Sequence, residues 1–157
     1  MKGKTVKSST IVTSQIMGIP DVNVAGNIHG GAIMKLIDTA AGAVAFRHAR
    51  SNAVTASIDR LDFHVPVYSG DLVTCKASLN YIGKTSMEIG VRVEAENLIK
   101  GDVRHTASAY LTFVALDEAG KPMVLPPLIL RTQVEKQRNQ EAKIRREARL
   151  REKHPNK

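Results

Sequence analysis

The 157-residue sequence predicts an α+β domain in which one central helix lies against a single antiparallel sheet. Apolar residues recur at helical spacing over about residues 30–49. The segments that follow alternate apolar and polar residues with a period of two, and short turns join them. A strand, a helix and then four long strands are the order expected when one helix covers one sheet. With 43% hydrophobic residues, the chain has enough core for one such domain.

The first expected elements are an edge strand, a loop and a slim helix. Residues 6–17 are polar and β-branched, which predicts a strand that ends before Pro20, and residues 18–27 are expected to form a loop. Residues 30–49 place five apolar side chains on one helical face: Ile33, Leu36, Ile37, Ala40 and Val44. The many glycines and alanines of this segment predict a helix that other backbones can approach closely.

Four strands are predicted after the helix. Residues 53–67 are rich in strand-forming residues, but their apolar phase shifts near Arg60 and Leu61, which indicates a β-bulge. Three further segments alternate regularly: residues 71–82, 86–97 and 104–116. The side chains expected to face the core are Val73, Cys75, Ala77, Leu79 and Tyr81 in the first of these, and Met87, Ile89, Val91, Val93 and Ala95 in the second. Such a sheet leaves an edge strand unpaired, so we expect pairing with a second copy of the chain.

Most of the net charge lies in a C-terminal tail. The formal charge is +8, and residues 131–157 hold ten Lys and Arg against four Asp and Glu, a net of +6. The basic and acidic residues of the preceding part of the chain nearly balance. A domain that binds nucleic acid would instead spread basic charge over one of its faces. The tail lacks an apolar stripe but offers the i,i+4 pairs Glu141–Arg145 and Glu147–Arg151, which predicts a solvated or partly docked helix.

We therefore expect a folded domain over residues 8–128 and a basic helical tail over residues 129–157, dispensable for activity. A minority hypothesis is that the tail binds nucleic acid or an anionic membrane, but its interleaved glutamates and lack of aromatic residues argue against it. We expect neither nucleic acid nor a membrane as a partner.

Composition favours a cytoplasmic protein without a metal. Cys75 is the one cysteine of the chain, so no internal disulfide can form. No stretch has the length of a signal peptide or a membrane span. The five histidines lack metal-ligand spacing, and no Walker or Rossmann glycine pattern occurs. Cys75 lies on the apolar phase of its strand, which favours a core thiol over a nucleophile.

Asp38 is the one carboxylate inside the predicted central helix. Its neighbours at i−4, i+3, i+4 and i+7 are not cations, and three of them are glycine or alanine. One interpretation is an aspartate on the helix flank that faces water or caps another segment. The other is a partly desolvated carboxylate at the wall of a cleft, able to act as a general base or nucleophile. The small neighbours favour the second interpretation because they leave room for a substrate.

The glycines before Asp38 could supply a complementary group. Residues 26–31, GNIHGG, lead directly into the helix, so amide groups near Gly31 point out of its start. Such amides can stabilise a developing oxyanion. The alternative is a tight turn with a helix cap, which is a common use of Gly-Gly.

Four blocks in this order resemble the hotdog-fold acyl-coenzyme A thioesterases, above all the cytosolic acyl-CoA hydrolases and related bacterial short acyl-CoA thioesterases. The blocks are GNIHGGAIMKLIDTAAGAVAFRH, VTASIDRLDFHVPVYSGD, GKTSMEIGV and TASAYLTFVALDEAGKPMVLPP, and the resemblance covers about residues 8–128. It implies a curved antiparallel sheet wrapped around one helix, with two hotdogs pairing edge to edge and three dimers forming a hexamer. It also implies hydrolysis of acyl-CoA to a free acid and coenzyme A, with no cofactor beyond the coenzyme A of the substrate.

The resemblance places the catalytic carboxylate of the family on Asp38 and its asparagine on Asn27. Asp38 would activate water or attack the thioester, Asn27 would orient the water or the thioester oxygen, and a backbone amide near Gly31 would polarise the carbonyl. Two-domain relatives divide the two side chains between their repeats, whereas this chain keeps both, which implies a homodimer with two equivalent sites. His29 is discounted as catalytic, since a structural role suits it better.

For the coenzyme A moiety, the resemblance favours the turn formed by Gly83, Lys84, Thr85 and Ser86, where a lysine and two hydroxyls could meet phosphate. A hairpin turn with an exposed lysine is the alternative interpretation. Arg60 and Arg104 are further candidate phosphate ligands near strand ends. The main alternative function is a non-catalytic acyl-CoA sensor, but no recognition-helix pattern for DNA accompanies the domain, and both Asp38 and Asn27 are retained.

Overall fold

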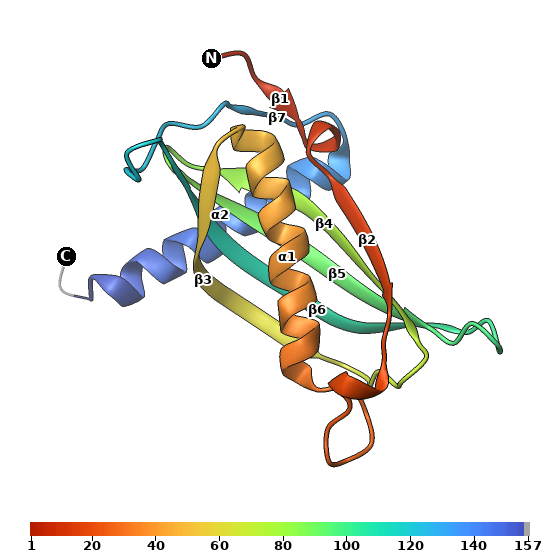
Figure 1. Cartoon of the computed structure of the whole chain (residues 1–157). Helices are drawn as coiled ribbons and strands as arrows, with labels where there is room; N and C mark the ends of the chain where they lie inside the picture. The colour runs from red at the N-terminus through yellow and green to blue at the C-terminus, as the bar shows by residue number, and fades with distance from the viewer. Residues whose placement is uncertain (156–157) are drawn as a thin grey trace.

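The protein has a five-stranded antiparallel sheet with one helix on each of its faces (Figure 1). The computed structural model describes residues 1–155. Helix α1 (Gly30–Ala49) lies in the concave face of the sheet, and helix α2 (Gln133–Lys153) crosses the opposite face. Neither of these helices has the length and apolar composition of a bilayer span among the described residues. The predicted α+β fold class is confirmed.

The strand order in the sheet is β2-β4-β5-β6-β3, which leaves β2 and β3 as its edges. The strands are β2 (Ile11–Ile16), β3 (Asn52–Phe63), β4 (Leu72–Ile82), β5 (Ser86–Glu96) and β6 (Val103–Leu116). A short parallel pair joins β1 (Lys4–Thr5) to β7 (Leu128–Ile129). The first long strand begins later than expected because Val6–Ser8 form a 3-10 turn. The other predicted strands and the central helix are confirmed within a few residues.

The inner face of α1 holds Ile33 and Ile37 in its first half and mainly small residues after them, as its sequence predicted. Ala40, Ala41, Val44 and Ala45 are fully buried against the sheet. A Cβ atom added at Gly42 would lie 3.7 Å from the ring of Phe113 on β6, so this position has no room for a large side chain. The apolar faces of β4 and β5 supply the other side of the core.

Tyr81 is an exception to the predicted alternation of β4. The register shifts between Leu79 and Tyr81, so Asn80 is an extra residue and the strand phase reverses after it. Tyr81 consequently faces α2, where the Arg146 guanidinium lies 5.8 Å from its ring centroid. The expectation that Tyr81 faces the core was wrong, because a bulge of one residue changes the face of every side chain beyond it.

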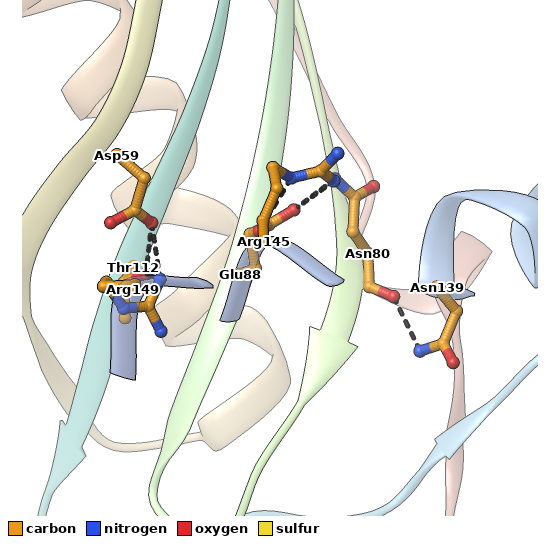
Figure 2. A network of polar contacts seen from close by, with 7 residues as sticks. All are labelled: Asp59, Asn80, Glu88, Thr112, Asn139, Arg145 and Arg149. Carbon is orange, nitrogen blue, oxygen red and sulfur yellow. Dashed lines mark hydrogen bonds and ion pairs between the residues drawn. The ribbon is translucent and has the colours of Figure 1, made fainter. Parts of the chain in front are cut away.

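Helix α2 docks on the sheet through arginines (Figure 2). Arg145 donates to both carboxylate oxygens of buried Glu88 on β5, at 3.1 and 2.7 Å, and its guanidinium lies 3.7 Å from the ring centroid of Tyr110. The expected Glu141–Arg145 pair is therefore replaced by a contact with the sheet, whereas Arg151 and Glu147 do approach each other at 3.9 Å. The tail is a docked helix, and Thr132 begins it with a capping box.

The C-terminal end of α1 holds a buried histidine. His48 is fully buried, and its Nε2 lies 2.9 Å from the carbonyl oxygen of Pro126. Lys4 donates to the His48 carbonyl oxygen at 2.6 Å, so β1 is tied to the end of the helix. Burial lowers the pKa of His48 from its ordinary value of 6.5, and the Lys4 ammonium lowers it further, although the Pro126 contact opposes both.

Candidate active site

Asp38 lies on the flank of α1 that faces the edge strand β3. Its side chain is half-buried, and Oδ1 accepts a hydrogen bond of 2.7 Å from the hydroxyl of Thr55. A carboxylate fixed through one oxygen keeps the other free to meet a reactant. This placement fits both interpretations of Asp38, because the carboxylate contacts a neighbouring strand and also lies beside the small residues of α1.

Thr55 is not among the residues that the sequence predicts for the site. It reaches Asp38 because of a bulge in β3. The register shifts between Thr55 and Ser57 and again between Ile58 and Arg60, so Ala56 and Asp59 are extra residues. Thr55 pairs with Phe113 on the inner face, while Ser57 pairs with Thr112 on the outer face. The predicted bulge near Arg60 is therefore confirmed, but it is double, and no local pattern indicates which strand hydroxyl will face the helix.

Two asparagines lie together in the loop before α1. Asn23 Nδ2 donates to Asn27 Oδ1 at 2.8 Å, and the Asn23 side-chain oxygen accepts from the amides of Ala25 and Asn27. Gly26, with a positive φ of 86°, closes this turn. The loop therefore presents an amide cluster at the N-terminal end of α1, to which Asn23 contributes as much as the predicted Asn27.

The asparagine cluster and Asp38 lie at different places along α1. Asp38 is eight residues after Gly30, the first residue of the helix, which corresponds to about 12 Å along the axis. A single thioester group is too small to contact the asparagine cluster and Asp38 of the same chain at the same time.

The amide of Gly31 is engaged within the chain. It donates a 2.9 Å hydrogen bond to Nδ1 of His29, which is the N-cap residue of α1. The Gly31 donor is therefore occupied in this structure, and the role of an amide near Gly31 in polarising the thioester carbonyl stays a prediction. His29 has the structural role expected of it, because it satisfies one of the orphan amides at the helix start.

Residues 83–86 form the turn between β4 and β5. Gly83 donates to the carbonyl oxygen of Ser86 at 2.8 Å, and the carbonyl oxygens of Thr85 and Lys84 accept from Ala115 and Leu125. The backbone of the turn is thus held on both sides, while the Lys84 side chain is exposed. An exposed lysine on a fixed turn suits phosphate binding and is equally compatible with a plain hairpin.

The two arginines proposed as phosphate ligands already contact carboxylates. Arg60 lies 2.6 Å from Asp62, on an exposed part of β3. Arg104 lies 2.6 Å from buried Asp71 and 3.1 Å from Asp102. The structure does not bring either arginine to Asp38 within one chain.

Cys75 is a core thiol, as predicted. It is buried in β4, and burial raises its pKa to about 11, although a hydrogen bond with Thr13 acts in the opposite direction. A thiol in this state is a poor nucleophile at neutral pH. The remaining candidates for the chemistry of the site are Asp38, Thr55 and the asparagine loop.

Comparison with known proteins gives consistent matches. The family model of the thioesterase superfamily matches residues 25–101. The mouse cytosolic acyl coenzyme A thioester hydrolase is 38% identical over 143 residues, which are 90% of this chain but only 38% of that protein. The chain thus spans less than half of that mammalian relative. An uncharacterised acyl-CoA thioester hydrolase from Bacillus subtilis is 37% identical over 82% of this chain and 74% of its own length.

Solved structures match over nearly the whole chain. An apo-hexameric acyl-CoA thioesterase has a TM-score of 0.94 and 36% identity, covering 98% of this chain and 99% of the other. The Staphylococcus aureus acyl-CoA hydrolase in complex with butyryl coenzyme A and coenzyme A has a TM-score of 0.88 and 33% identity, covering 96% and 92%. Structures of that hydrolase also include alanine variants of an aspartate, an asparagine and a threonine.

Proposed function

The chain belongs to the thioesterase superfamily of hotdog fold, and we propose that it hydrolyses acyl-CoA to a carboxylic acid and coenzyme A. The observation that carries the proposal is the contact between Asp38 and Thr55, which fixes a carboxylate beside the small residues of α1. Relatives named as acyl-CoA thioester hydrolases and a structural neighbour bound to coenzyme A support the substrate class.

The spacing of three residues supports the assignment of the site. In the S. aureus hydrolase, the substituted aspartate follows the substituted asparagine by 15 positions, and the threonine follows the aspartate by 17. Asn23, Asp38 and Thr55 have the same two separations, whereas Asn27 and Asp38 do not. This favours Asn23 over Asn27 as the side chain that acts with Asp38, with Asn27 as the residue that holds it.

In the proposed reaction, Asp38 takes a proton from water as the water oxygen attacks the thioester carbonyl carbon. The tetrahedral intermediate then breaks its carbon–sulfur bond, and the proton passes to the departing sulfur of coenzyme A. Direct attack by the carboxylate, with later hydrolysis of an anhydride, is the alternative route. The Thr55 hydroxyl would hold the carboxylate in orientation, and the asparagine amide would stabilise the carbonyl oxygen or position the water.

We further propose that two chains share each site and that the assembly is a homodimer, repeated three times as a hexamer. The separation along α1 described above supports a shared site. Strand β3 is an edge strand that exposes Val54, Ile58 and Phe63, an apolar surface of the kind that a second copy would cover. The hexameric thioesterases among the structural neighbours are consistent with this assembly.

The turn of Gly83, Lys84, Thr85 and Ser86 remains our proposal for the coenzyme A phosphates. Lys84 is the stronger candidate, because Arg60 and Arg104 would each have to leave a carboxylate partner. The mammalian relatives are named as cytosolic, and we propose a cytosolic location for this chain.

The experiment that tests the function is a thiol-release assay on acyl-CoA substrates from acetyl to palmitoyl. We expect steady release of coenzyme A with at least one chain length, abolished by substitution of Asp38. An acyl ester of a simple alcohol serves as a control for unspecific esterase activity. If every acyl-CoA is stable with a folded oligomeric protein, the hydrolase proposal is wrong, and retained binding of acyl-CoA would then favour the sensor.

A further inference from the structure

We propose that Arg149 of helix α2 is a positioning residue for the active site, since it clamps the β3 bulge from the outer face of the sheet while Thr55 contacts Asp38 on the inner face. The inference rests on the proposed function. It gives the basic tail a role opposite to the dispensability that its sequence suggests.

The clamp consists of three side chains around the carboxylate of Asp59, and Figure 2 shows two of them, Thr112 and Arg149. Asp59 Oδ2 accepts from the Thr112 hydroxyl at 2.6 Å and from Arg149 Nη1 at 2.8 Å. Arg149 Nη1 also lies 2.8 Å from the Thr112 oxygen, and Ser57 donates to Asp59 Oδ1 at 2.7 Å. The side chains of Arg149 and Asp59 are 18% and 12% exposed, so solvent screens this pair less than a surface ion pair.

The carboxylate of Asp59 lies in the bulge itself. Asp59 is the extra residue of the second register shift, and Ser57 follows the extra residue of the first. Both ends of the irregular segment are thus tied to one carboxylate. A bulge interrupts the ladder of backbone hydrogen bonds, so side-chain contacts must fix its geometry.

The clamp and Thr55 contact consecutive residues of β6. Thr112, which contacts Asp59 and Arg149, is the register partner of Ser57, and the next residue of β6, Phe113, is the partner of Thr55. The bulge at Ala56 is what turns Thr55 inward while Ser57 faces outward. A change in the bulge would therefore change the direction of the Thr55 hydroxyl and the position of the Asp38 carboxylate that it holds.

Strand β3 needs this support because it is an edge strand with one neighbour in the chain. Helix α2 runs across the outer face of the sheet. The C-terminal end of α2, where Arg149 is located, reaches β3. The guanidinium, which stays charged at all relevant pH values, is suited to a partly buried carboxylate.

Arg145 provides a matched control one turn earlier on the same helix. It has a comparable half-buried guanidinium and pairs with a more deeply buried carboxylate, Glu88. Glu88 belongs to β5, an interior strand held by ladders on both sides. Loss of Arg145 would therefore weaken the docking of α2 without removing the contact at the bulge.

The test compares Arg149→Ala, Arg149→Lys and Arg145→Ala in the full-length chain, below the melting temperature of each. We expect Arg149→Ala to lower kcat for acyl-CoA by about tenfold or more with little change in KM, because small displacements of catalytic groups are costly. Arg149→Lys should recover much of the rate, since it restores one donor to Asp59. Arg145→Ala should lower the melting temperature by at least as much as Arg149→Ala does, but it should keep kcat within about twofold of wild type.

A second comparison asks whether Arg149 acts through Thr55. In a Thr55→Val background, Arg149→Ala should cost little further kcat, because the contact that it positions is already absent. Equal kcat losses in Arg149→Ala and Arg145→Ala, or full additivity with Thr55→Val, would overturn the proposal and leave Arg149 as a general docking residue.

Hydrogen exchange gives a readout that does not depend on activity. Arg149→Ala should speed amide exchange in the β3 peptide covering residues 52–63, whereas Arg145→Ala should not. If the wild-type protein proves inactive on acyl-CoA, the proposed function fails while this measurement still decides whether the clamp exists. Unchanged exchange in β3 would refute the clamp even in an active enzyme.

Discussion

Asn23 and Asn27 are joined side chain to side chain, with Asn23 Nδ2 donating to Asn27 Oδ1 at 2.8 Å. The Asn23 oxygen in turn accepts from two backbone amides of the same turn. The two asparagines thus belong to one hydrogen-bonded loop before α1, and a change in one alters what holds the side chain of the other.

The first prediction separates the two asparagines. Asn23→Ala should lower kcat by about 10² if Asn23 stabilises the thioester oxygen. Asn27→Asp keeps an acceptor for Asn23 and should retain more activity than Asn27→Ala. Steady-state kinetics and circular dichroism of all three variants check this. A larger kcat loss in Asn27→Ala than in Asn23→Ala would reverse the roles.

Asp38→Asn tests the carboxylate. The amide is nearly isosteric and can still accept from Thr55, but it is neither a base nor a nucleophile. We expect kcat to fall by at least ~10² with an unchanged melting temperature. Activity within threefold of wild type would remove Asp38 from the mechanism.

Mixed dimers test whether the site is shared. Asp38→Ala and the more damaging asparagine variant should each be nearly inactive alone. After co-refolding, about half of the dimers are mixed, and each has one site with both side chains intact, so about a quarter of wild-type activity should return. Mass spectrometry verifies the heterodimers. No recovery in their presence would show that both residues act within one chain.

His48 predicts acid sensitivity of the fold. Because burial lowers its pKa, the folded state binds fewer protons than the unfolded state below the ordinary pKa of 6.5. The free energy of unfolding should therefore fall as the pH drops below that value. His48→Gln keeps a donor for the Pro126 carbonyl and should show a shallower decline between pH 7 and 5 in urea titrations. Equal slopes in the two proteins would contradict a neutral buried His48.

The sequence was informative where one periodicity continued over many residues. The alternation of β5 and the small face of α1 both predict burial correctly, since each follows from side-chain spacing alone. Tyr81 was misplaced because a single extra residue at Asn80 reverses the phase, and such a bulge depends on tertiary packing. The tail sequence likewise predicts a helix but leaves open whether it is solvated or partly docked.

Asp38 could be identified as a candidate catalytic residue because a carboxylate is unusual in an apolar helix, and its catalytic role stays a prediction. Thr55 could not, because its role depends on a bulge and on a partner 17 residues away. The Arg149–Asp59 contact joins residues that are 90 positions apart. The sequence around Arg149 does not distinguish it from the other arginines of the basic tail. Contacts between elements are decided by packing geometry, which composition and spacing do not specify.

The arginine-based docking of α2 sets the response of the protein to salt. In this helix Ala142 is the one buried apolar residue among those described, and the helix contacts the sheet mainly through ion pairs, arginine–tyrosine contacts and hydrogen bonds. Because the Arg145–Glu88 and Arg149–Asp59 pairs are partly buried, ionic strength screens them less than exposed pairs, and sulfate strengthens the burial of the core. We therefore expect α2 to stay docked at salt concentrations that release an exposed pair such as Arg151–Glu147, so that limited trypsin digestion of the helix changes little with added salt.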